Sequence, residues 1–108
     1  MNVSSITILG NKALDNSFMY SLNNMKNLTT ITILGNNLTE ILLNAFNGDH
    51  PGLEKNYLGN KSITKIGSNA FSSLKNLKLL DLSKNSICIL DNNSLNFTSG
   101  QNTGYKIK

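Results

Sequence analysis

Apolar residues recur along this chain at a regular interval, so that similar units follow one another. The repeating units begin at Val3, Leu28, Leu53 and Leu77. From most of these starts, apolar side chains return at the third, fifth and tenth following positions. Within one unit, Ile31 and Ile33 alternate with Thr30 and Thr32. This alternation, with β-branched side chains at every position, predicts a short half-buried strand over residues 28–33.

Equivalent positions of successive units are expected to stack as neighbouring parallel strands, about 4.7–4.9 Å apart. The inward columns would be Ile6, Ile31, Asn56 and Leu80, and then Ile8, Ile33, Leu58 and Leu82. The rest of each unit must return beneath the sheet and bury further Leu and Phe side chains. We therefore predict a solenoid over residues 1–97 and a polar tail or linker over residues 98–108. The four predicted repeats are 3–27, 28–52, 53–76 and 77–97.

The repeated pattern L-x-x-L-x-L-x-x-N-x-L resembles the leucine-rich repeat. Residues 77–87 fit this pattern without a gap, and residues 63–77 resemble the subclass that is common in extracellular receptors and adhesion proteins. The resemblance implies a right-handed solenoid of the α/β type. It places a short parallel sheet on the concave face, and loops with short 3-10 or helical turns on the convex face. It also implies a non-catalytic module that binds a protein or peptide ligand, or a glycan, on the concave face.

Asparagine stands at the eighth position after the unit start in three of the four units. The predicted ladder consists of Asn11, Asn36 and Asn85. An inward carboxamide can bridge backbone groups of adjacent turns, since it carries both donors and an acceptor. The third unit departs from the pattern, with Lys61 at the ladder position and Asn56 at an apolar position. In an alternative register Asn60 takes the ladder position, and Tyr57 then points inward.

The outward positions of the predicted strands supply the candidate ligand-binding residues. They are Thr7, Leu9, Thr32, Leu34, Lys55, Tyr57, Leu79 and Asp81. Leucines grouped around a tyrosine are typical of a modest hot spot at a protein interface. The alternative interpretation is that these are ordinary surface residues of a short solenoid.

Charge and composition exclude several classes of function. The chain has 108 residues and a net charge of +4, and its basic residues are all lysines, scattered along the sequence. Because planar recognition of phosphate and guanine favours Arg, we do not expect nucleic-acid binding. One Cys and one His are too few for an internal disulfide, a Cys-based zinc site or a multi-His metal site. No apolar run is long enough to span a membrane.

The sequence contains no evident catalytic constellation. His50 lies in the turn-like segment 48–52 and is expected either in a surface loop or partly filling a core slot. The carboxylates fall at different phases of the repeat, which argues against a paired acid–base site. Cys88 is expected to be a plain small residue rather than a reactive thiol. We therefore predict no enzyme activity, no catalytic residue, no metal and no cofactor.

Two functional contexts stay open. The chain can be a piece of an extracellular or cell-surface receptor or adhesion protein, and six Asn-x-Ser/Thr sequons would allow glycosylation there. It can instead be a cytoplasmic scaffold or regulatory subunit that positions a partner enzyme, because the N-terminus lacks the features of a signal peptide. Cysteine-paired caps are absent, so end-to-end self-association through uncapped solenoid ends is a further expectation.

Overall fold

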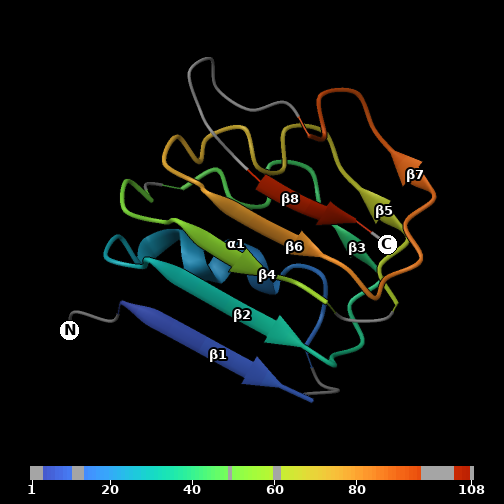
Figure 1. Cartoon of the computed structure of the whole chain (residues 1–108), viewed down its shortest axis with the longest axis horizontal. Helices are drawn as coiled ribbons and strands as arrows, with labels where there is room; N and C mark the ends of the chain where they lie inside the picture. The colour runs from blue at the N-terminus through green and yellow to red at the C-terminus, as the bar shows by residue number, and fades with distance from the viewer. Residues whose placement is uncertain (1–3, 11–13, 49, 60–61, 96–103, 108) are drawn as a thin grey trace.

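The computed structural model describes residues 4–10, 14–48, 50–59, 62–95 and 104–107. The chain coils into a solenoid whose parallel strands form two sheets. The larger sheet contains, in order, β1 (Ser5–Leu9), β2 (Thr30–Leu34), β4 (Lys55–Tyr57), β6 (Leu79–Leu82) and β8 (Gly104–Ile107). The smaller sheet contains β3 (Glu40–Ile41), β5 (Lys65–Ile66) and β7 (Ile89–Leu90). Figure 1 shows the strands of the larger sheet side by side and pointing the same way.

The predicted register of the larger sheet is confirmed. Ile8 of β1 lies opposite Ile33 of β2, and Asn56 of β4 lies opposite Leu80 of β6. In each pair, the two partners are separated along the chain by one repeat. Just beyond β4, the backbone N–H of Leu58 donates to the carbonyl of Asp81 at 2.8 Å. Equivalent side chains of successive turns therefore form continuous columns.

The alternative register of the third repeat is wrong. Asn56 is fully buried, whereas Tyr57 is only half-buried and alternates with it along β4. A register with Tyr57 inward would turn Leu58, which is completely buried, toward solvent. The hydrophobic cost of exposing Leu58 explains why the strand keeps Asn56 inside. Asn60 and Lys61 lie outside the described residues.

The core lies between the larger sheet and the returning arcs of the repeats. Phe46 and Phe71 occupy equivalent positions of adjacent repeats, and their rings stack with centroids 5.4 Å apart. Fully buried aliphatic side chains fill the space around them, including Leu28, Ile33, Leu38, Ile41, Leu53, Leu58, Ile63, Ile66, Leu74 and Leu82. Each turn thus buries its apolar side chains against the turns before and after it.

The first returning arc differs from the later ones. It forms the short helix α1 (Phe18–Ser21) and the 3-10 turn η1 (Leu22–Asn24). In Figure 1, α1 lies behind the larger sheet. Leu22 of η1 is buried in the core together with Met19 of α1. The later arcs carry β3, β5 and β7 instead, and the sequence analysis did not predict this smaller sheet.

A side chain closes one edge of the smaller sheet. Asn16 Oδ1 accepts hydrogen bonds from the backbone N–H groups of Thr39, at 2.9 Å, and Glu40, at 3.4 Å. Asn16 Nδ2 donates to Thr39 Oγ1 at 2.9 Å. The carboxamide of Asn16 therefore supplies the acceptor that a preceding strand would otherwise present to the start of β3.

A second column of asparagines marks the outer turns. Asn44, Asn69 and Asn93 occupy equivalent positions and have φ values of 57°, 56° and 64°. The N–H of Asn44 donates to the carbonyl of Ser68 at 3.0 Å, and that of Asn69 donates to the carbonyl of Asn93 at 3.2 Å. Asparagine adopts this left-handed region more readily than most residues. Part of the high asparagine content therefore has a backbone cause that is separate from the predicted ladder.

The C-terminal segment extends the larger sheet. Leu79 of β6 lies opposite Gly104, and Leu82 lies opposite Ile107, so β8 continues the period of the earlier strands. Residues 104–107 thus differ from the polar tail expected over residues 98–108, and the rest of that range lies outside the described residues. The physical reason is that the outer edge of β6 offers backbone donors and acceptors that a further strand can pair.

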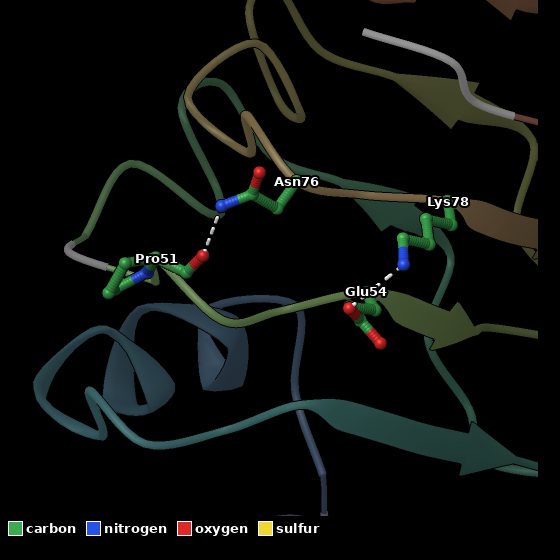
Figure 2. A network of polar contacts seen from close by, with 4 residues as sticks. All are labelled: Pro51, Glu54, Asn76 and Lys78. Carbon is green, nitrogen blue, oxygen red and sulfur yellow. Dashed lines mark hydrogen bonds and ion pairs between the residues drawn. The ribbon is translucent and has the colours of Figure 1, made fainter.

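Two polar side-chain contacts join adjacent repeats near the starts of β4 and β6 (Figure 2). Asn76 Nδ2 donates to the backbone carbonyl of Pro51, and Lys78 Nζ lies 3.2 Å from Glu54 Oε2. The Lys78 side chain is 68% exposed. An exposed ion pair of this kind contributes only about 0–1 kcal/mol, so the columns of apolar side chains hold the repeats together.

Candidate binding site on the outer strand face

The side of the larger sheet that points away from the core is called here the outer face. The register places all eight candidate residues on it, in three rows across the strands. One row is Thr7, Thr32, Tyr57 and Asp81; the second contains Lys55 and Leu79; the third contains Leu9 and Leu34. The strand alternation that buries their neighbours leaves these side chains exposed or half-buried.

Apolar side chains reach solvent on this face. Leu9 is 65% exposed and lies in register with Leu34, which is half-buried. Tyr57 and Leu79, on the next two strands, are also half-buried. A group of apolar side chains on adjacent strands is stronger evidence for a binding surface than isolated exposed leucines are.

The outer face is hollowed where β2, β4 and β6 end. The hollow has a volume of about 340 Å³. Its lining residues are Leu34, Gly35, Tyr57, Gly59, Asp81, Ser83 and Lys84. Leu34, Tyr57 and Asp81 were candidates from the sequence, whereas the two glycines, Ser83 and Lys84 were missed.

Gly59 accounts for the hollow. It stands at the repeat position that Leu34 and Ser83 occupy in the repeats on either side, so the row of side chains is interrupted there. A Cβ on Gly59 would lie 2.9 Å from the carbonyl oxygen of Ser83 and 3.6 Å from Leu34 Cδ2. The first distance is shorter than ordinary contact, so any side chain would push the backbone after β6 away. A glycine at a position where the adjacent repeats carry a side chain was the feature of the sequence that could have indicated the hollow.

A local turn orients the acidic wall of the hollow. Asp81 Oδ1 accepts hydrogen bonds from Ser83 N–H at 2.9 Å and from Ser83 Oγ at 2.5 Å. A side-chain oxygen that accepts from the backbone two residues later is the usual asparagine or aspartate turn. The turn holds the Asp81 carboxylate in place and directs the chain toward Lys84.

Lys84 has an uncommon backbone conformation. Its φ is 64°, close to the values of 63° and 69° at Gly10 and Gly35, which occupy the equivalent positions of the first two repeats. A side chain in this region costs roughly 1–2 kcal/mol, a cost that glycine avoids. Lys84 is exposed and lines the hollow, at a position where the first two repeats carry glycine.

Comparison with known proteins agrees with this geometry. Residues 51–98 match the family model described as leucine rich repeat. Over these residues the chain is similar to leucine-rich repeats. β1 and β2 lie before the matched residues and continue the same sheet register. No curated protein and no solved structure matches the chain. Leucine-rich repeat domains generally mediate protein binding and are typically non-catalytic.

The asparagine positions of the repeats lie beneath the strand ends that line the hollow. Asn85 Nδ2 donates to the carbonyls of Leu58, at 3.0 Å, and Leu82, at 2.9 Å, and Asn85 Oδ1 accepts from the N–H of Ile63 at 3.2 Å.

Asn36 makes similar but longer contacts in the second repeat. Its Nδ2 donates to the carbonyls of Leu34, at 3.1 Å, and Ile8, at 3.4 Å. Asn36 and Asn85 are both buried. Asn11, the first residue of the predicted ladder, lies outside the described residues.

Among the described residues, the groups with catalytic or metal-binding chemistry lie apart from one another. His50 is 3% exposed, and its Nε2 lies 3.0 Å from Asn23 Oδ1, so it fills a core slot rather than a surface loop. Cys88 is exposed, next to β7. Within the described part of the chain, no three His, Cys, Asp or Glu side chains group as a metal site would require. A search of the same residues finds no helix with the length and apolarity to span a bilayer.

Proposed function

We propose that this chain is a recognition module that binds a protein or peptide through its outer strand face, which we take to be the concave face. The observation that carries the proposal is the sheet register. It gathers Leu9, Leu34 and Tyr57 on neighbouring strands, while the residues between them on each strand are buried or half-buried. An aromatic anchor beside exposed aliphatic side chains has the composition of an interface hot spot.

We place the module in a receptor or adhesion-type protein. Residues 63–77 support this placement, since they resemble the extracellular subclass of the repeat. Two sequon asparagines, Asn37 and Asn92, are exposed and could carry glycans without burying them.

A cytoplasmic scaffold that positions a partner enzyme is the second candidate. The observation that favours it is Cys88, an exposed free thiol. Free thiols persist in the reducing cytosol, whereas secreted proteins tend to pair their cysteines. Detection of glycans on the protein purified from its native source would decide for the first placement. Their absence together with a reduced Cys88 would decide for the second.

Binding through the outer face can be tested with a library of random dodecapeptides displayed on phage, with the immobilised chain as the target. Binders should lose about tenfold or more in affinity for the Tyr57→Ala variant, as expected for a hot-spot residue. Leu43→Ser is the matched control, because Leu43 is 56% exposed and lies outside the larger sheet. Circular dichroism would verify that each variant is folded. Peptides that bind Tyr57→Ala and Leu34→Ser as tightly as the native chain would contradict the proposal.

A further inference from the structure

We infer that the hollow at Gly59 receives an apolar or aromatic side chain of a partner peptide, and that acidic residues flank this side chain in the partner. The inference rests on the proposed function, because it specifies the partner's chemistry at the same face. It follows from the shape of the hollow, from the ion pairing of the surrounding lysines and from the backbone of Lys84.

The shape of the hollow suits one large side chain. Its volume of about 340 Å³ is at the lower end of the range for ligand pockets, roughly 300–1,000 Å³. Leu34 and Tyr57 provide apolar wall, and the backbone at Gly35 and Gly59 provides surface without side chains. An inserted aliphatic or aromatic side chain would therefore contact the carbon atoms of Leu34 and Tyr57. The polar groups of Asp81 and Ser83 would then be available to hydrogen-bond the peptide backbone.

The lysines of the outer face point to an acidic partner. Lys78, just before β6, pairs with Glu54, so its ammonium group is matched within the chain. Lys55, two residues before Tyr57 on β4, and Lys84, in the hollow, form no ion pair with any described residue.

Among the described residues that line the hollow, Asp81 is the one carboxylate and Lys84 the one lysine, so the excess of positive charge on this part of the face comes from Lys55. Asp81 directs one carboxylate oxygen to Ser83, which fixes it in the turn after β6. Because the whole chain also has a net charge of +4, acidic residues in a partner would be attracted during approach and matched after docking.

The backbone of Lys84 adds a third argument. The equivalent positions Gly10 and Gly35 adopt the same left-handed conformation without a side chain. A lysine held there despite its steric cost is the kind of outlier that tends to mark a functional position. In this fold it places a lysine in the lining of the hollow, together with the apolar side chains of Leu34 and Tyr57 and the carboxylate of Asp81.

The test uses the same dodecapeptide library and compares charge-reversal variants. Face-dependent binders, defined by weaker binding to Leu34→Ser, should share one aliphatic or aromatic residue flanked by Asp or Glu. Their affinity should fall about tenfold or more for Lys84→Glu and for Lys55→Glu, as for close charge pairs at interfaces. It should change less than about twofold for Lys26→Glu, an exposed lysine of the first repeat that alters the net charge equally.

The outcomes separate this inference from the proposed function. Face-dependent binders with basic or neutral flanks, or with equal losses for Lys26→Glu and Lys84→Glu, would overturn the acidic partner and leave recognition by the face intact. Binders that are insensitive to Leu34→Ser and Tyr57→Ala would overturn both. Acidic-flanked binders that respond selectively to Lys55→Glu and Lys84→Glu would establish the inference.

Discussion

Asn56 lies directly opposite Ile31 on the neighbouring strand, so a carboxamide occupies a column of the core that is otherwise aliphatic. Asn56 is fully buried, and neither its Nδ2 nor its Oδ1 has a hydrogen-bond partner within the described part of the chain. A buried polar group left in this state costs about 1–3 kcal/mol. The third repeat is therefore held together by its apolar neighbours in spite of this residue.

We expect Asn56→Val to stabilise the fold. Valine removes the unsatisfied carboxamide, suits a strand and fits a column shared with Ile31 and Leu80. The free energy of unfolding in urea should rise by about 1–3 kcal/mol. Asn85→Val is the matched control and should lower it, because the Asn85 carboxamide is bonded. A loss of stability in Asn56→Val would show that the carboxamide has a partner in solution, such as a buried water.

The hydrogen bonds of the two ladder asparagines, Asn36 and Asn85, should contribute differently to stability. Asn85→Ala strands the carbonyl of Leu58 and the N–H of Ile63, whereas the equivalent contact of Asn36, to Ile8, is longer. We expect Asn36→Ala to lower the free energy of unfolding by about 1–3 kcal/mol and Asn85→Ala to lower it at least as much. Thermal melts would measure both. The exposed neighbour Asn37 is the control, and losses for Asn36→Ala no larger than for Asn37→Ala would argue against the ladder.

Lys84→Asn should stabilise the chain while weakening binding. Asparagine tolerates the φ of 64° better than lysine, so the free energy of unfolding in urea should rise by about 0.5–1 kcal/mol. Lys26→Asn serves as the control for the loss of one positive charge. A fall in stability specific to Lys84→Asn would mean that the lysine side chain makes a stabilising contact of its own.

Removal of residues 104–108 should destabilise the solenoid. The deletion leaves the edge of β6 without the backbone pairing that β8 provides. Several hydrogen bonds worth about 0.5–1.5 kcal/mol each are lost, so the urea midpoint should fall measurably. Hydrogen exchange at Leu80 and Leu82 would locate the effect on β6. Unchanged stability and exchange would instead agree with a polar tail.

The sequence predicts the larger sheet well because its columns combine two strong signals, the regular repeat length and the alternation of buried and exposed positions. Ile8, Ile33, Leu58 and Leu82 illustrate this. The smaller sheet was missed because β3, β5 and β7 are too short for alternation to show. β8 was missed although Tyr105 and Ile107 lie in register with Leu80 and Leu82, because polar neighbours mask this weak signal.

The sequence predicted the residues of the candidate site only where the type of side chain indicates an outward position on a strand. Leu34, Tyr57 and Asp81 stand out as outward residues of strands, and they line the hollow. Gly59 contributes to the hollow because it has no side chain there. Lys84 contributes through a positive φ value, which a lysine in the sequence does not indicate. Both effects depend on the backbone that follows each strand, which a pattern of apolar positions does not specify.

Asn16 has a consequence for how such a chain can lengthen by gene duplication. Its carboxamide already satisfies the start of β3, so a duplicated unit inserted ahead of β3 would have to displace it. A copy inserted between β3 and β5, or between β5 and β7, would meet the same parallel backbone partners on either side. Growth by internal duplication would therefore be directional, with each new unit adding one strand to the larger sheet downstream of Asn16.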